Sequence, residues 1–130
     1  MDTKETVHIG DLHFDHKLWI NELKFFELQL NVFEERLGEV AALRTENSIG
    51  AKIEAFQNRI IRQKEVIDEI KHKIRLREQD ISDFDNRAAV EAGGLLFEDH
   101  ANEREEMSTF IRLYQNMRDE YFEFLKVATA

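Results

Sequence analysis

The sequence predicts an all-α protein, an antiparallel bundle of three long helices, and three observations lead to this prediction. The chain of 130 residues contains no proline and five glycines, so few of its residues would interrupt a long helix. Hydrophobic residues make up 42% of the chain and charged residues 35%, which is typical of a folded domain rather than a disordered segment. Apolar residues also recur at alternating steps of three and four, the spacing of one helix face. We therefore expect residues 1–130 to form a single helical-bundle domain.

The first helix is expected over about residues 12–44. Asp11, which follows Gly10, is a suitable N-cap, because its carboxylate can accept hydrogen bonds from the free amides of a first helical turn. The apolar pattern fades at Arg44. We call the apolar row of each helix its inner seam, and in this helix it consists of Leu12, His16, Trp19, Leu23, Phe26, Leu30, Phe33, Leu37 and Val40.

The second and third helices are expected over about residues 48–79 and 95–127. Either Asn47 or Ser48 can cap the second helix. Its inner seam consists of Ile49, Ile53, Phe56, Ile60, Gln63, Ile67, Ile70 and Ile74. The inner seam of the third helix consists of Leu96, His100, Glu103, Met107, Phe110, Tyr114, Met117, Tyr121 and Phe124. The three predicted helices are nearly equal in length, so they can pack side by side from end to end.

The connector between the second and third helices, residues 80–94, differs in composition from both. It holds three aspartates early and the pair Gly93 and Gly94 late. Two interpretations fit this composition. The connector is either a loop or a short helix over about residues 83–92 that the glycines end.

Net charge and residue usage limit the classes of function. A net charge of −9 and a pI near 5.0 argue against a nucleic-acid partner, because most of the surface would repel a phosphate backbone. No stretch approaches the roughly 18 apolar residues of a membrane span, and the first ten residues lack the features of a secretory signal. We therefore expect a cytoplasmic protein with no membrane partner. Since there is no cysteine, any metal would need histidine and carboxylate ligands.

Charge is distributed unevenly along the chain. Residues 1–47 carry a net charge of −5, residues 48–79 a net charge of +3, and residues 80–130 a net charge of −7. A basic helix between two acidic ones favours pairing within the bundle and disfavours wrong registers. The basic run from Lys71 to Arg77 is accordingly expected to form a solvated helix face beside acidic neighbours rather than a nucleic-acid-binding patch.

The first helix carries more apolar surface than its inner seam requires. A second, adjacent stripe consists of Phe14, Leu18, Phe25, Leu28 and Val32, and Ile20 adds to the apolar total. One interpretation is a wide apolar face that fills the core of the bundle. The other is a homodimer in which two chains share this surface of the first helix.

Polar residues interrupt the inner seams at His16, Gln63, His100 and Glu103. Burying such groups is costly unless they are paired, so each is expected to have a partner. For Gln63 the expected partner is Tyr114 on the third helix. In an up-down-up bundle the first and third helices run parallel, so the two histidines, each near the start of its helix, lie at the same level.

This convergence predicts a candidate metal site at the end formed by the starts of the first and third helices. His13 lies one turn before His16, and His100 and Glu103 are three residues apart, so facing turns offer ligands to one ion. A further candidate ligand is His72, near the corresponding level of the second helix. Three imidazoles and a carboxylate suit zinc, iron or copper better than calcium or magnesium. Nearby acids expected to support or extend the ligand set are Glu22, Asp68 and Glu69.

Two other interpretations of the polar cluster remain open at this point. It can be a structural cluster whose hydrogen bonds fix the register of the helices. It can also be a ligand-binding or pH-sensitive pocket, in which protonation of His16 and His100 opens this end because Glu103 offsets only one charge.

Motifs for catalysis are absent from the sequence. There is no phosphate-binding glycine loop and no Gly-x-Ser-x-Gly nucleophile turn. The primary prediction is therefore a non-enzymatic interaction or structural module with an unknown protein partner. The alternative prediction is a metal-binding helical bundle.

Overall fold

The computed structural model describes the backbone of residues 2–84 and 90–130 and the side chains of residues 10–83 and 98–130. Its helices are α1 (Asp2–Leu43, 42 residues), α2 (Asn47–Phe84, 38 residues) and α3 (Val90–Ala128, 39 residues). The backbone so described contains no strand. The prediction of an all-α bundle of three long helices is confirmed.

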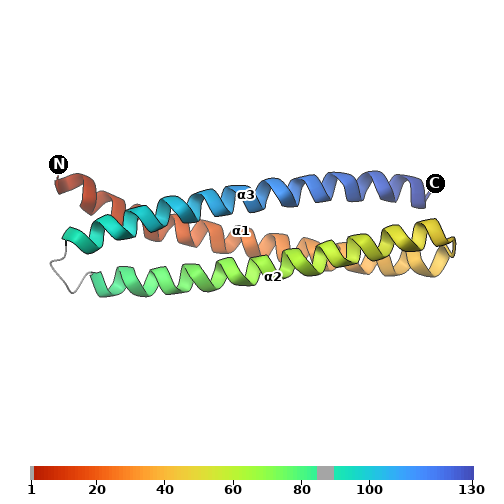
Figure 1. Cartoon of the computed structure of the whole chain (residues 1–130), viewed down its shortest axis with the longest axis horizontal. Helices are drawn as coiled ribbons and strands as arrows, with labels where there is room; N and C mark the ends of the chain where they lie inside the picture. The colour runs from red at the N-terminus through yellow and green to blue at the C-terminus, as the bar shows by residue number, and fades with distance from the viewer. Residues whose placement is uncertain (1, 85–89) are drawn as a thin grey trace.

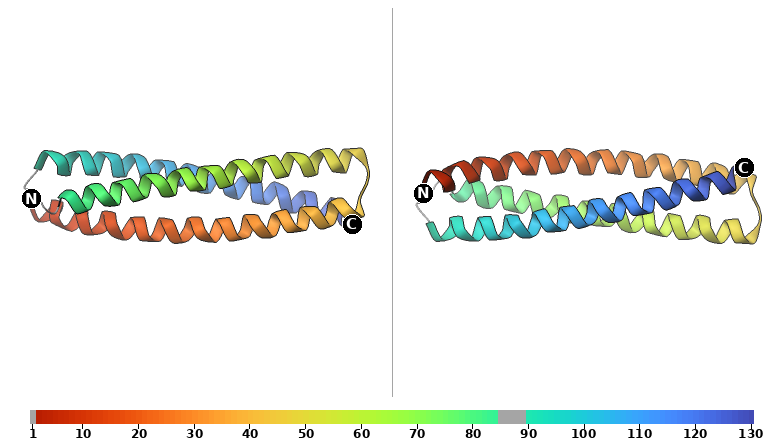
Figure 2. Two further views of the ribbon diagram at one scale, coloured as in Figure 1. Left: turned by 90° about the horizontal axis from the view of Figure 1, so that it is seen from below. Right: turned by 90° about the horizontal axis from the view of Figure 1, so that it is seen from above.

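The three helices lie side by side along one axis, with α1 and α3 parallel to each other and α2 antiparallel to both (Figures 1 and 2). The start of α1, the end of α2 and the start of α3 therefore meet at one end of the bundle. The C-terminus lies at the opposite end, beside the turn between α1 and α2 (Figure 1). At that end Arg44 Nη1 donates a 2.8 Å hydrogen bond to the carbonyl of Ala128, which satisfies a free acceptor of the last turn of α3.

The first helix begins earlier than predicted. It starts at Asp2 and passes through Gly10, so Asp11 is an ordinary helical residue rather than an N-cap. A glycine inside a helix costs only about 1 kcal/mol relative to alanine, so one glycine does not oblige a long helix to start after it.

The predicted connector is also largely helical. Residues 80–84 continue α2, and residues 90–94 belong to α3, which runs through Gly93 and Gly94. The interpretation that these glycines end a separate short helix is wrong. The rest of the predicted connector, residues 85–89, lies outside the described residues.

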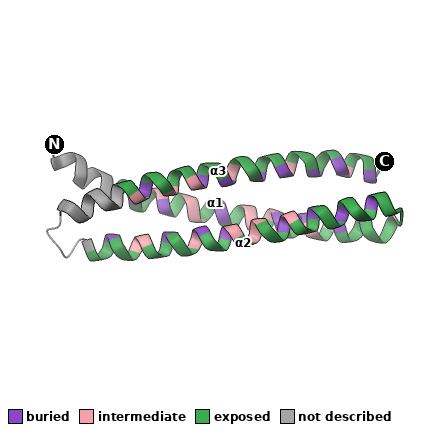
Figure 3. Ribbon diagram, viewed as in Figure 1, coloured by how far each residue is buried: buried purple, intermediate pink, exposed green. Residues whose placement is uncertain are grey.

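The inner seams form the core of the bundle. Every inner-seam residue with a described side chain is buried or half-buried, and Leu96 lies outside the described side chains (Figure 3). Leu23, Leu30 and Leu37 of α1 are fully buried, as are Ile60 and Ile67 of α2. Each such side chain contributes about 1.5–3 kcal/mol through burial, so the three-and-four spacing supplies the main stabilising force.

The adjacent stripe on α1 does not fill the core. Phe14, Leu18, Phe25, Leu28 and Val32 are each between 44% and 64% exposed. Only Ile20 from this surface packs against the core. The interpretation of the stripe as a wide core face is therefore wrong, and its five side chains form an apolar strip on the outside of the bundle.

Salt bridges connect α2 to both neighbours. Among the described side chains, five of them use a lysine or arginine of α2: Lys64 with Glu34 and Lys71 with Glu27 on α1, and Arg59 with Glu120, Lys73 with Glu106 and Arg77 with Asp99 on α3. Surface pairs of this kind contribute about 0–1 kcal/mol each, so they select register and neighbours more than they stabilise. The predicted charge complementarity is confirmed, and the basic run beginning at Lys71 faces acidic neighbours.

The tyrosines of α3 use α1 as their hydrogen-bond partner. Tyr121 Oη donates to the carbonyl of Phe33 at 2.9 Å, and Tyr114 Oη donates to Gln29 Oε1. The predicted pairing of Gln63 with Tyr114 is therefore wrong, because a residue flanking the inner seam of α1 reaches the phenol instead. Gln63 Oε1 is a buried atom without a hydrogen-bond partner.

Candidate functional site

A polar cluster lies at the end of the bundle where α1 and α3 begin and α2 ends. Its centre consists of His16 from α1 with His100 and Glu103 from α3. The two histidines are 2% and 3% exposed, and they are the buried polar residues within the described side chains. They occupy the same level because each sits near the start of its inner seam, on two parallel helices.

Three ligand atoms of these side chains face one another. His16 Nε2 lies 3.2 Å from Glu103 Oε1, and His100 Nδ1 lies 3.7 Å from the same oxygen. Donor atoms of all three residues lie within 4.8 Å of one another. Two imidazoles and a carboxylate thus converge on one small volume.

The outward nitrogen of each imidazole contacts a different carboxylate. His16 Nδ1 is 2.7 Å from Glu78 Oε2 of α2, and His100 Nε2 is 3.0 Å from Asp15 Oδ2 of α1. Asp15 also accepts from Arg104 Nη2 at 3.4 Å. A carboxylate that accepts from one ring nitrogen fixes the orientation of the ring, and so it directs the other nitrogen toward the centre of the cluster.

Trp19 covers the cluster from within α1. Its ring stacks on His100 with 4.9 Å between centroids and 18° between planes. It also contacts His16 at 5.7 Å, and the two imidazoles meet edge to face at 5.2 Å. These aromatic contacts limit rotation of both imidazoles and exclude water from one side.

The other predicted ligands do not join the centre. The exposed ring of His13 bonds through Nδ1 to Glu78 Oε1 at 2.5 Å, on the outer side of that carboxylate. The ring of His72 is exposed on α2. Of the acids expected nearby, Glu22 and Asp68 are exposed, and the exposed Glu69 contacts Arg62. The structure therefore brings together three of the five candidate ligands.

Glu78 and Asp15 are not among the site residues predicted from the sequence. Their signal was present: the seam of α2 continues past Ile74 to the buried Ile81, and Glu78 lies between them. Asp15 precedes His16 on the side of α1 that faces α3. Both residues flank an inner seam rather than occupy it, so the spacing of the seams alone does not identify them.

The cluster favours a positive charge at its centre. Burial alone would lower the pKa of His16, but hydrogen bonds and attraction from Glu103 and Glu78 outweigh burial and raise it. Burial likewise opposes the ionised form of Glu103, but its contacts with His100 and His16 lower its pKa. The pKa of Asp15 is also lowered, because contacts with His100 and Arg104 outweigh its partial burial.

Two buried atoms of the cluster lack hydrogen-bond partners: His100 Nδ1 and Glu103 Oε2. Both are potential ligand atoms. A buried polar atom without a partner costs about 1–3 kcal/mol, and His16, His100 and Glu103 form a group that could hold a metal ion.

Openings on two sides connect the cluster to solvent. A cavity of about 480 Å³ between α1 and α2 is lined by His16, Glu78 and neighbouring residues. A smaller cavity of about 220 Å³ between α2 and α3 reaches Glu103 beside Arg77. The two cavities therefore approach the cluster from opposite sides of α2, and the atoms at its centre remain buried.

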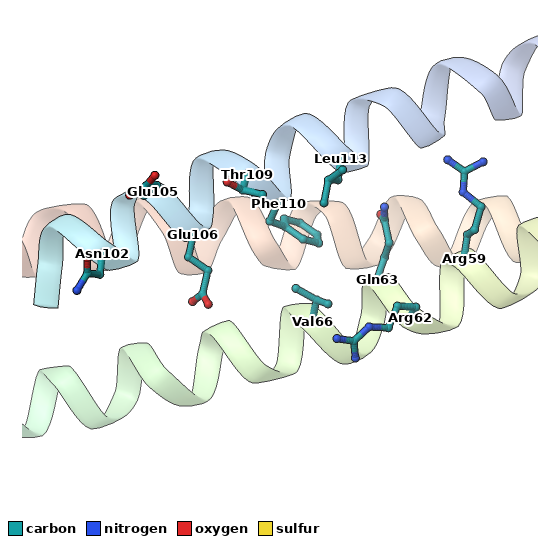
Figure 4. A pocket seen from close by; sticks show the side chains of 10 residues that line it. All are labelled: Arg59, Arg62, Gln63, Val66, Asn102, Glu105, Glu106, Thr109, Phe110 and Leu113. Carbon is teal, nitrogen blue, oxygen red and sulfur yellow. The ribbon is translucent and has the colours of Figure 1, made fainter.

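A larger groove lies apart from the cluster, between α2 and α3 (Figure 4). Its volume is about 630 Å³, and Val66, Phe110 and Leu113 supply its apolar surface. Arginines from α2 and glutamates from α3 also line it, so neither sign of charge dominates. The groove shares no residue with the polar cluster and brings no histidine or set of ligands together.

The raised pKa of His16 predicts that protonation of this imidazole stabilises this end of the bundle, whereas the sequence allowed the interpretation that protonation opens it. Because the pKa of His16 is higher in the folded protein than its ordinary value of 6.5, the protonated imidazole stabilises the fold below pH 6.5. This stabilisation is lost as the pH rises through the folded-state pKa. In the presence of a chelator, we therefore expect the free energy of unfolding to fall as the pH rises above 6.5. The lowered pKa of Glu103 adds stability above about pH 4.5 that is lost on acidification. Chemical denaturation at a series of pH values measures both limbs. His16→Gln should flatten the alkaline limb, whereas His72→Gln should leave it intact.

Comparison with known proteins identifies no relative. No protein-family model matches the chain, and neither characterised proteins nor solved structures give a match. In the part of the chain described here, no helix has an apolar stretch long enough to cross a membrane. Function is therefore inferred from the side chains themselves.

Proposed function

We propose that this chain is a metal-binding helical bundle that holds one divalent transition-metal ion between His16, His100 and Glu103. The observation that carries the proposal is the buried, unpartnered Nδ1 of His100, which faces Glu103 while its Nε2 bonds to Asp15. In the neutral ring that donates from Nε2 to Asp15, Nδ1 carries a lone pair beside the Glu103 carboxylate, 3.7 Å away. A cation bound there removes the repulsion that the lone pair and the carboxylate would otherwise experience.

The distances in the cluster favour zinc among the three candidate metals. Ligand atoms on a tetrahedral zinc ion lie about 3.4 Å apart, given bonds of about 2.0–2.1 Å. Two contacts of Glu103 Oε1, at 3.2 Å to His16 and 3.7 Å to His100, bracket that value. Two imidazoles, one carboxylate and a water are a common zinc ligand set, which also suits ferrous iron, whereas copper(II) prefers a tetragonal arrangement.

The surroundings of the ligands support the same proposal. In metal sites a ligating histidine usually donates its second ring N–H to a carboxylate or carbonyl, which fixes the tautomer and raises basicity. Glu78 and Asp15 supply such a carboxylate to His16 and His100, respectively. The metal would therefore join α1 directly to α3, and α2 indirectly through Glu78. The ion would have a structural role of locking this end of the bundle.

Zinc titration of the untagged, metal-free protein tests the proposal. We expect one equivalent to bind, and zinc at 100 times its dissociation constant should stabilise the fold by about 2.7 kcal/mol. For a chain of this size that is roughly 10 °C in Tm. Isothermal titration calorimetry gives the stoichiometry, and thermal unfolding gives the shift.

Three single variants separate a built site from adventitious binding. His100→Gln should abolish binding at the site, and Glu78→Gln should weaken it by about 10- to 100-fold. The matched control is His72→Gln, which removes an exposed imidazole outside the cluster and should leave the affinity unchanged. The proposal is contradicted if His72→Gln loses zinc binding while His100→Gln retains it. It is also contradicted if zinc does not raise the Tm of the wild type.

A further inference from the structure

The exposed stripe on α1 has the spacing of a second heptad seam. Phe14, Leu18, Phe25, Leu28 and Val32, together with Asn21, follow one another at steps of four, three, four, three and four. This is the repeat by which one helix packs along another in a coiled coil. We call these six residues the outer seam.

The five apolar residues of the outer seam lie away from the rest of the bundle, and Asn21 also lines the cavity between α1 and α2. Heptad positions a and d of α1 form the outer seam, whereas the buried residues of α1 occupy positions b and f, nearly opposite on the helix. The other large exposed hydrophobic residues are divided between all three helices and include Ile61, Leu76 and Leu113. Five large apolar side chains in one exposed row are typical of a surface that a partner covers.

We propose that the outer seam packs against the outer seam of a second copy of this chain, as a parallel and in-register coiled coil. This inference does not depend on the metal site. It gives the interaction role predicted from the sequence a definite partner and names the residues in contact.

Charges beside the outer seam favour the parallel arrangement. Lys17 and Lys24 occupy g positions and Glu22 an e position, all three are exposed, and no salt bridge within the described side chains includes them. In a parallel dimer, Lys17 of each chain lies beside Glu22 of the other, which gives two attractive pairs. An antiparallel dimer with the same apolar overlap places each Lys24 beside its own mate and each Glu22 beside its own mate, so both contacts are repulsive.

The remaining e positions are engaged within the chain and do not oppose this arrangement. Asp15 contacts His100 and Arg104, and Gln29 accepts from Tyr114. Their polar groups therefore remain on the α3 side of α1. The side chains left to pair across the dimer are those with complementary charge.

Asn21 also favours a dimer of two copies that are parallel and in register. A single polar residue among apolar seam positions lowers stability unless it meets another polar group, and two asparagine amides can bond to each other. In the parallel in-register dimer, Asn21 faces its own symmetry mate. In the antiparallel arrangement it faces Phe25, which leaves both amides without partners.

The mass of the protein in solution tests the homodimer. We expect sedimentation equilibrium to give twice the chain mass of 15.4 kDa, with dissociation on dilution. Phe25→Glu should raise the dissociation constant by at least about 100-fold, because two carboxylates would be buried in the seam. The control Leu113→Glu introduces the same charge at a similarly exposed position of α3 and should leave the dimer intact. A monomer at all concentrations, or a dimer insensitive to Phe25→Glu, overturns the proposal.

Cysteine cross-linking tests the direction of the two helices. The chain has no cysteine, so Val32→Cys introduces a single thiol near one end of the outer seam. In the parallel dimer the two thiols are adjacent and should form a disulfide on mild oxidation. In an antiparallel dimer they lie about 27 Å apart at 1.5 Å per residue, which prevents the bond. Absence of a cross-linked dimer, with the mass still doubled, overturns the parallel arrangement.

A charge exchange tests the flanking pairs independently. Lys17→Glu should weaken the dimer, because it places two carboxylates side by side at each flank. Adding Glu22→Lys to the same chain exchanges the charges and should restore most of the affinity. If the double variant is no tighter than Lys17→Glu alone, the proposed contact between Lys17 and Glu22 is wrong.

Discussion

Replacing His16, His100 and Glu103 together by leucine is expected to stabilise the metal-free protein, by about 1–4 kcal/mol in the free energy of unfolding. The three side chains lie at inner-seam positions, where leucine has a suitable size and packs without loss of solvation. Buried ionic groups have a large desolvation cost that their mutual attraction rarely exceeds. The two carboxylates left behind are partly exposed, and each keeps a partner: Glu78 has His13, and Asp15 has Arg104.

Glu103→Leu alone is expected to act in the opposite direction. It removes the acceptor of His16 Nε2 and the only carboxylate near His100 Nδ1 in the described cluster, but leaves both imidazoles buried. An unsatisfied buried polar group costs about 1–3 kcal/mol, so this variant should lose about that much stability.

Urea denaturation in the presence of a chelator measures both variants against the wild type. The slope of the unfolding free energy against denaturant should remain unchanged if the variants retain the fold. The two variants are expected to change the free energy of unfolding in opposite directions. A polar cluster that serves zinc binding lowers the stability of the metal-free protein. Its replacement by leucine restores that stability but removes the stabilisation by zinc. A triple variant less stable than the wild type would mean that the cluster stabilises the bundle by itself.

The fold could be predicted because periodicity and burial agree over the whole length of the inner seams. Positions such as Leu23, Ile60 and Met117 are apolar at the required steps, and all three are fully buried. Helix ends were predicted less well. Gly10 and the pair Gly93 and Gly94 resemble helix boundaries in sequence, but their cost within a long packed helix is small.

The centre of the polar cluster was predictable for the same reason as the core. His16, His100 and Glu103 interrupt inner seams, and the parallel direction of α1 and α3 places them at one level. Glu78 and Asp15 were not predicted, because they lie beside the seams, and which flanking side chain reaches an imidazole depends on helix rotation and rotamers. Periodicity determines the buried face of a helix but leaves these choices open.

Leu30→Ala and Leu28→Ala, two residues apart on α1, are expected to have different effects because they lie on different seams. Leu30 is fully buried in the core, and its truncation should lower the free energy of unfolding by about 2–5 kcal/mol through lost burial and a cavity. Leu28 is 64% exposed, and its truncation should change the stability of the dilute monomer by no more than about 0.5 kcal/mol.

Self-association should show the reverse order. Leu28→Ala removes an apolar side chain from each side of the proposed dimer and should weaken it by about 10- to 100-fold, whereas Leu30→Ala leaves the outer seam unchanged. Unfolding by urea at low concentration and sedimentation at high concentration separate the two effects. If Leu28→Ala lowered stability as much as Leu30→Ala in the dilute monomer, the outer seam would belong to the fold of one chain. If it changed neither quantity, the exposed apolar row would have no role in joining two copies.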